Sequence, residues 1–391
     1  MKKAVCIILI IFIFVSNPMF YGGVYAYAES DEQSIEVQIQ DCVNEQLENL
    51  DTTELEQLFS DLSNSNEIFK TNDFFGIIKK LISGEMQVDG NNVISYILKI
   101  FFDDVLNFLP YASLILAISV LYSMVTSSTN SNKSLGDIIH FVCFGAIVTI
   151  SISCIIHLVG ITTNCIGFIK KQTDIVFPIL LTMITALGGN VSVSVFQPSM
   201  AILSGACVTL FTNILLPLFT FKIIFTVISN ITSGVKFNKF VEFFGSSFKW
   251  ILGGILTIFT AFLSISGIMA GGVDGISIKT AKYTIKSSIP LVGGFLSDGV
   301  SVMMLSCSLI KNAIGVSGLI MLFCTIIVPV LKIIVFSLLL KLVTAILEPI
   351  ADARVTSFVG ELSKSISTLV AIILGISFMY FVIVALIMCV I

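Results

Sequence analysis

A run of mixed polar and apolar residues, Gly272–Gly318, holds the side chains of this sequence best suited to chemistry in a membrane. It begins with Lys279, Lys282 and Lys286, whose spacing of three and four residues places them on one face of a helix. Lysine stems can lie along a bilayer surface while their ammonium groups stay in water. The pattern therefore predicts a basic helix at a membrane surface, ended by Pro290.

The segment that follows, Leu291–Ile310, is long enough to cross a bilayer but is unusually polar. It contains Gly293 and Gly294, and Asp298 and Ser301 share one side of a helix with the second glycine. A carboxylate at membrane depth usually faces a bundle interior or a water-filled path. Two interpretations fit: a polar pathway, or close packing of helices on small residues with the carboxylate near the interface.

The whole chain has the composition of a membrane protein. Of its 391 residues, 56% are hydrophobic and 12% are charged, whereas soluble proteins have about 25% charged residues. The charge is divided unevenly, because residues 29–104 hold 17 acidic residues and 4 lysines. Phosphates repel such a segment, so we expect no nucleic-acid binding. The sequence predicts an all-α, polytopic integral membrane protein with a short exported helical N-terminal region.

Residues 1–28 have the pattern of a secretory signal peptide. Lys2 and Lys3 precede an apolar run, and Ala26-Tyr27-Ala28 has the pattern of a cleavage site. The alternative is an uncleaved anchor. In either case the segment that follows is expected outside the cytoplasm.

The exported acidic region, residues 29–104, contains helical stripes of apolar residues. One helix is expected to open at a capping box that begins with Thr53 and to place Leu55, Leu58 and Phe59 on one face. A region this small buries little core by itself. We therefore expect the stripes to be covered by the membrane surface, by another copy or by another exported protein, with a self-contained helical bundle as the alternative.

The membrane body divides into a hairpin and two similar units. Residues 105–163 are expected to form a transmembrane hairpin. Residues 164–272 and 273–391 are expected to be related three-segment repeats, each with a proline-led interrupted segment, a long apolar helix and a final apolar helix. Coincidence among apolar residues is the alternative. A shift of 112 residues aligns two pairs of prolines, Pro178 with Pro290 and Pro217 with Pro329.

Pro217 and Pro329 lie inside apolar stretches and are expected to kink their helices. Asn213 lies one turn before the first of them. Paired interrupted segments are a pointer to a polar pathway, so these three residues are further candidates for pathway or assembly roles. If each interrupted segment crosses the membrane, the two halves are inverted. If each dips in and returns, the halves are parallel.

No motif supports an enzyme. The sequence has no Gly-rich phosphate loop ending in Gly-Lys-Ser/Thr, no His/Cys/carboxylate set at metal-ligand spacing and no Ser/His/Asp grouping. We therefore expect no catalytic, cofactor or metal site, and we expect energy for any transport to come from another protein.

Three runs carry a family resemblance: VDGISIKTAKY at 273–283, IPLVGG at 289–294 and SLIKNAIGV at 308–316. Together they resemble the stage III sporulation protein AE family of endospore-forming bacteria, and the leader, acidic segment and polytopic body are similar to that family as well. Ser301 departs from the pattern, since the resemblance implies a second acidic residue there. The resemblance places these residues in the family's hallmark stretch, with no catalytic role: Lys279, Lys282, Pro290, Gly293, Gly294, Asp298 and Lys311.

The resemblance implies a membrane subunit of a channel-like secretion complex that links mother cell and forespore and supports late forespore development. The implied location is the mother-cell membrane around the forespore. The implied partners are other subunits of the complex, including a traffic-type ATPase and ring-forming proteins. Membrane lipid and a second copy of the chain are further expected partners, because of the apolar composition and the uncovered helical stripes. Two other functions stay open: a secondary carrier of a small solute and a structural assembly scaffold.

Overall fold

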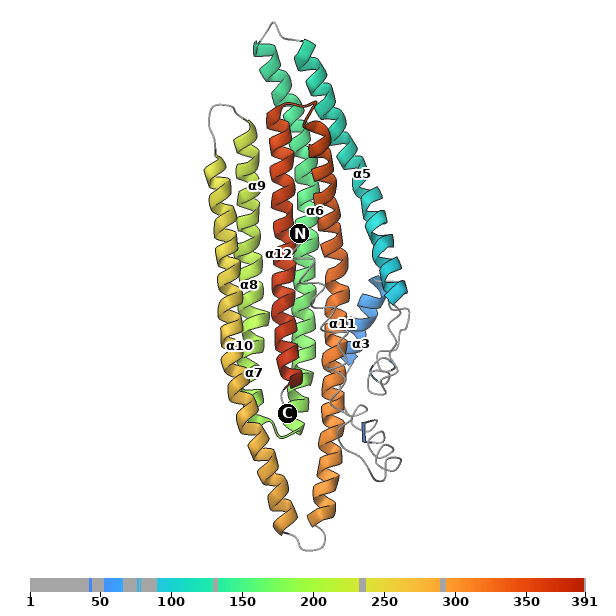
Figure 1. Ribbon diagram of the computed structural model, residues 1–391, viewed down its shortest axis with the longest axis vertical. Coiled ribbons are helices and arrows are strands. Elements are labelled where there is room, and N and C mark those ends of the chain that lie inside the picture. Colours follow the sequence, from blue (N-terminus) through green and yellow to red (C-terminus); the bar gives the residue numbers. More distant parts are fainter. Residues whose placement is uncertain are drawn as a thin grey trace.

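A computed structural model describes residues 42–43, 53–65, 76, 78, 90–128, 133–231, 237–288 and 293–389, which are helical apart from short turns. Within this part of the chain, six helical lengths are long and apolar enough to cross a membrane. They alternate in direction and form one elongated bundle (Figure 1). The all-α, multi-span architecture is confirmed. The expected signal peptide, residues 1–28, lies outside the described residues.

The elements follow the chain in a simple order. Helix α3 (Thr53–Ser65) precedes a hairpin of α5 (Gly90–Ser128) and α6 (Lys133–Ala186). The third length consists of α7 (Asn190–Ala201), η2 (Ile202–Cys207), α8 (Val208–Leu210), η3 (Phe211–Leu215) and α9 (Leu216–Ile231), where η marks a π-helix. Three long helices complete the bundle: α10 (Asn238–Ser288), α11 (Gly293–Leu347) and α12 (Ala353–Cys389).

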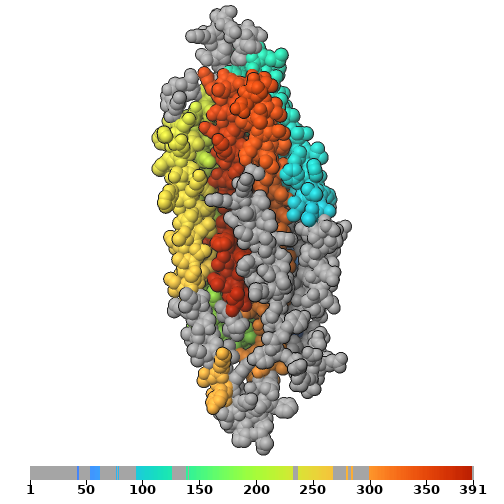
Figure 2. Space-filling model, viewed as in Figure 1, coloured from blue at the N-terminus to red at the C-terminus, as the bar shows by residue number. Residues whose placement is uncertain are grey.

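Helices α11 and α12 form the centre of the bundle. In their most apolar windows 61% and 67% of the residues are buried, against 17% for α10. In the space-filling view α10 forms one edge of the molecule and α5 the other (Figure 2). Because most residues of these windows are buried in protein, many of their serines and glycines do not have to face lipid.

Several helices are longer than a bilayer is thick. The apolar lengths of α6 and α11 contain 46 and 49 residues, which at 1.5 Å per residue is about 70 Å, against a hydrocarbon core of about 30 Å. At one end the α5–α6 hairpin extends past the other helices, and at the opposite end α10 and α11 do so (Figure 1). The bundle therefore projects well beyond the hydrocarbon core.

The predicted division of the second unit into an interrupted segment and a separate long apolar helix is wrong. Helix α11 is continuous from Gly293 to Leu347 and passes through Pro329, so Leu291–Ile310 does not form a separate segment in the described residues. Glycine costs a buried helix only about 1 kcal/mol relative to alanine, and one proline removes one backbone hydrogen bond. Neighbouring helices supply enough packing to offset both.

The first unit also divides differently from expectation. Pro178 lies inside α6, and the chain turns later, at Gly188, which has a φ of 85°. The Gly188 N–H donates to the Thr185 carbonyl and the Gly189 N–H to the Ile184 carbonyl, both at 2.9 Å. These two bonds are a Schellman motif, in which glycine supplies the left-handed residue that ends a helix.

The lengths that the 112-residue shift matches, α7–α9 and α11, run in the same direction in Figure 1. One helix, α10, lies between them in the chain, which gives the parallel arrangement rather than the inverted one. The relation between the two units as repeats stays a prediction.

The apolar stripe of α3 is covered by the chain's own long helices. Leu55 and Leu58 have no exposed surface and Phe59 is buried, and α3 packs against α6 and α11. A 3.6 Å ion pair between Lys171 Nζ and Asp61 Oδ2 joins the same surfaces. The sequence had suggested the membrane surface, another copy, another protein or a separate bundle as the cover. Sequence periodicity shows that a stripe needs a partner but does not identify it.

Gly375 is the point where α12 meets two outer elements. A Cβ atom there would lie 3.1 Å from Leu252 Cδ1 on α10 and 3.2 Å from Phe211 Cε1 on η3. A larger side chain would therefore push three packed elements apart.

We expect Gly375→Val to destabilise the fold by about 1–3 kcal/mol, because overpacking forces strained rotamers or a helix shift. The measurement is denaturant unfolding of the purified chain in micelles, followed by circular dichroism. Gly253→Val on α10 is the matched control, since no atom lies within 4 Å of a Cβ at that position. Equal stability of the two variants would contradict the close approach at Gly375.

Candidate functional site

The candidate site is a set of buried polar contacts that joins α6, α11 and α12. Gln172 on α6 is 1% exposed, and its Nε2 donates to the Gly318 carbonyl at 2.6 Å and to Tyr380 Oη at 3.1 Å. The Phe177 ring packs edge-on against the Tyr380 ring, with centroids 5.6 Å apart. One amide thus holds three helices together inside the bundle.

Gly318 makes this crossing possible. A Cβ atom at this position would lie 3.0 Å from Tyr380 Oη and 3.3 Å from Val176 Cγ1. The Gln172 Oε1 atom is buried and has no hydrogen-bond partner among the described atoms. Buried oxygens without a hydrogen-bond partner are rare in folded proteins. The amide is therefore held in place by the two bonds of its nitrogen.

Lys311, in the hallmark stretch, lies in the same core. Its side chain has no exposed surface, and its Nζ donates to the Met388 carbonyl at 3.2 Å. That carbonyl belongs to the last turn of α12, where backbone oxygens lack helical partners and the helix dipole is negative. Lys311 therefore fastens α11 to the end of α12 and does not face lipid.

Serine contacts close the same helix pair near its other end. Ser337 Oγ donates to the Ser363 carbonyl at 3.0 Å, and Ser363 Oγ donates to the Ser337 carbonyl at 2.8 Å. At the connecting turn, Tyr122 Oη of α5 donates to Asp352 Oδ2 at 3.1 Å. The other carboxylate oxygen of Asp352 accepts the Arg354 N–H at 2.8 Å and so caps the start of α12.

The sequence interpretation missed Gln172, Tyr380, Ser337 and Ser363. The only available signal was a polar residue inside an apolar run. That signal is shared by many serines and threonines that bond only to their own helix, such as Thr162 with the Leu158 carbonyl at 2.8 Å.

The other predicted residues that the structure describes are spread over η3, α9, α10 and α11. Lys279 is exposed on α10, and Lys282 and Lys286 follow on the same helix, with their side chains outside the described set. At the start of α11 lie Gly293, Gly294 and Asp298, whose surroundings also lie outside it. Ser301 is partly buried, and Pro290 lies outside the described residues.

The first-unit candidates face outward. Asn213 on η3 and Pro217 on α9 are both exposed, whereas Pro329 in α11 is partly buried. The expected irregularity before Pro217 is present as η2 and η3. Because proline has no N–H, the Asn213 carbonyl loses its α-helical partner, and a wider π turn is one way to accommodate this.

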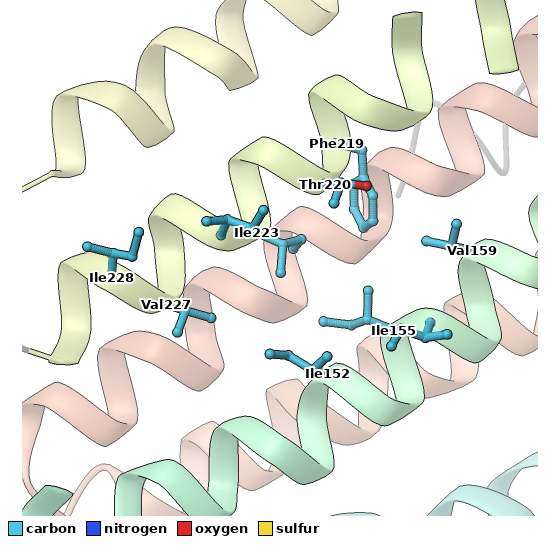
Figure 3. Close-up of a pocket in the computed structure, with 10 residues that line it drawn as sticks. Ile152, Ile155, Val159, Phe219, Thr220, Ile223, Val227 and Ile228 are labelled. Atoms are coloured by element: carbon cyan, nitrogen blue, oxygen red, sulfur yellow. The ribbon is translucent and has the colours of Figure 1, made fainter. Parts of the chain in front are cut away.

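The chain has an apolar groove between α6 and α9, shown in Figure 3. Its volume is about 360 Å³, and its lining includes Ile155 and Val159 of α6 and Phe219 and Ile223 of α9. The hydroxyl of Thr220, which also lines it, donates to the Leu216 carbonyl at 3.0 Å. The lining therefore offers neither charge nor a free hydroxyl, which suits hydrocarbon and not water or ions.

A second, polar depression lies between α3 and α6. Glu54, Lys170, Lys171 and Asp174 line it, and Lys170 Nζ pairs with Asp174 Oδ2 at 3.2 Å. None of the candidate pathway residues lines this depression or the apolar groove.

We expect Gln172→Leu and Tyr380→Phe each to destabilise the fold by about 1–3 kcal/mol, because each leaves a buried polar partner unsatisfied. The double variant should be less destabilised than the sum of the two, with a coupling of about 0.5–3 kcal/mol in a double-mutant cycle. Denaturant unfolding in micelles gives the free energy of unfolding of the wild type, the two single variants and the double variant.

The control cycle pairs Tyr380→Phe with Thr182→Val. Thr182 is exposed and its hydroxyl bonds within α6, to the Ile179 carbonyl, so these two effects should add. Additive effects for Gln172 and Tyr380 would show that the bond between them contributes nothing.

Comparison with known proteins places the chain among sporulation proteins. Residues 72–390 match the family model described as stage III sporulation protein AE. A protein of that name from Bacillus subtilis (strain 168) is 24% identical over 268 residues, which cover 68% of this chain and 67% of the relative. No solved structure matches the chain.

Proposed function

Because the chain belongs to the stage III sporulation protein AE family, we propose that it is a membrane subunit of a channel-like secretion complex linking mother cell and forespore. It acts in late forespore development, from the mother-cell membrane around the forespore. Its partners are other subunits of that complex, including a traffic-type ATPase and ring-forming proteins. The family match and the six helical lengths that can cross a membrane support this proposal.

Within such a complex the chain serves as a platform. The observation that carries this role is Lys311, a charged residue of the hallmark stretch that is fully buried and bonded to the backbone of α12. A carrier needs its charged groups to reach a water-filled path. Here that charge is used to join two helices, so α11 and α12 provide a rigid core on which outer helices and partners assemble.

The platform role is tested by replacing the chain in its native endospore-forming host. Asp298→Asn should leave the frequency of heat-resistant spores unchanged, because a platform does not need that carboxylate. Gly375→Val should lower the frequency, because it disturbs the core. Immunoblots of membrane fractions control for protein level. Loss of spores with Asp298→Asn at a normal protein level would contradict the platform role and favour a polar pathway.

A secondary carrier of a small solute is the second candidate, supported by the π-helical segments η2 and η3. Irregular turns within a spanning helix are frequent at functional sites. Purified protein in liposomes, loaded with ion-sensitive dyes, tests this function. Movement of an ion or solute down its gradient would favour the carrier. Liposomes that stay impermeable in the presence of the protein would exclude this function.

A further inference from the structure

Three helical lengths that pack together each have a long run without charged residues, and each run is bounded by a lysine at the same end of the bundle. Val191–Phe221, Trp250–Val273 and Ser365–Cys389 contain no charged residue, and each is longer than the ~20 residues that cross a bilayer. A lysine lies next to one end of each run: Lys222 of α9 directly follows the first run, and Lys249 of α10 and Lys364 of α12 directly precede the second and third. Lys222 lies in the last stretch before the end of α9, and Lys249 and Lys364 lie near the starts of α10 and α12. These helix ends share one end of the bundle (Figure 1).

The three lysines come from the three helices that meet at one junction. Lys222 is partly buried, and its Cε lies 3.4 Å from where a Gly245 Cβ would be, which places the lysine stem against α10. Lys222 interacts electrostatically with Lys249 and Glu361, and Glu361 interacts with Lys364. Helices α9, α10 and α12 pack against one another in pairs, so the junction is a built part of the fold.

The junction has an excess of positive charge. Glu361 is the one carboxylate found in electrostatic contact with Lys222 within the described residues, and its Oε2 also accepts a long, 3.5 Å hydrogen bond from Asn230 Nδ2. Three lysines against one carboxylate leave two positive charges uncompensated. The nearby Lys239 pairs with Glu242 at 3.0 Å and adds no net charge.

Aromatic surface adjoins the lysines. Phe225 stacks on Phe240 and on Phe244, with ring centroids 5.2 Å apart in both pairs. Phe240 is half exposed, and Trp250, directly after Lys249, is 79% exposed. Aromatic residues beside lysines are typical of the level where lipid headgroups meet hydrocarbon. A ligand that fits both features carries a phosphate and apolar chains.

We propose that the α9–α10–α12 junction binds the phosphate headgroup of an anionic phospholipid. Lys222, Lys249 and Lys364 hold the phosphate, and the acyl chains lie along the exposed aromatic surface. Glu361 and Asn230 keep the lysines apart and oriented. The lipid thereby fixes the three helices at the level of the headgroups, and it couples the fold to the charge of the membrane.

The test uses Trp250, the only tryptophan of the chain. The full chain is reconstituted in phosphatidylcholine vesicles in which a fixed fraction of lipid carries brominated acyl chains, either as phosphatidylglycerol or as phosphatidylcholine. Because bromine quenches tryptophan fluorescence at short range, we expect several-fold stronger quenching by the brominated phosphatidylglycerol. Equal quenching by the two lipids would overturn the proposal.

The matched variants distinguish a specific lipid site from general electrostatic attraction between the protein and anionic lipid. Lys249→Gln with Lys364→Gln removes two exposed lysines and should abolish the preference, while quenching by brominated phosphatidylcholine stays at the wild-type value and reports an intact fold. Lys222→Arg keeps the charge and should keep the preference. Lys239→Gln, on the same hairpin, should leave it unchanged. A preference that survives in the double variant would overturn the site.

Inorganic phosphate distinguishes the two sources of the ligand. A lipid site keeps its preference when inorganic phosphate is added at constant ionic strength. Loss of the preference would mean that the junction takes free phosphate, and it would overturn the assignment to lipid.

Discussion

The pairing of α11 with α12 is the constraint on which the rest of the structure depends. Apolar side chains gain little by leaving lipid for a protein interior, so membrane helices are held together by close packing and by hydrogen bonds between helices. The pair has both, through Gly318 of α11 against Tyr380 of α12 and through the reciprocal serine bonds. The two helices are also the most buried candidate spans, and they shelter polar residues that lipid would reject.

Polar residues form hydrogen bonds that join the two helices of this pair to each other and to the helices around them. Gln172 attaches α6, Lys311 ties α11 to the end of α12, and Asp352 links the connecting turn to α5 through Tyr122. Each makes a hydrogen bond to another helix, which is consistent with a subunit that serves as a platform. The outer helix α10 has the least buried apolar window of the six, and its lysines and aromatic residues meet the surroundings of the bundle.

Much of the fold could be predicted from the sequence, because hydrophobic length and helical period are local properties. The helix boundaries at Thr53 and before Pro290, and the hairpin of α5 and α6, follow from capping, proline and turn residues. Less of the site could be predicted. Lys311 was singled out only by the resemblance to the family's hallmark stretch. Gln172 and Tyr380 are 208 positions apart, and local pattern carries no information about such a contact.

The sequence by itself determined the class of the protein: apolar lengths that must be helical in lipid, an acidic front region and a hallmark stretch that marks the family. The tertiary structure decided which of these lengths is central, where α11 continues through its glycines and proline, and which polar residues meet. The reason is physical. Backbone hydrogen bonding within a helix is settled by neighbours along the chain, whereas the partner of a buried amide or ammonium is settled by helices that the chain order does not place side by side.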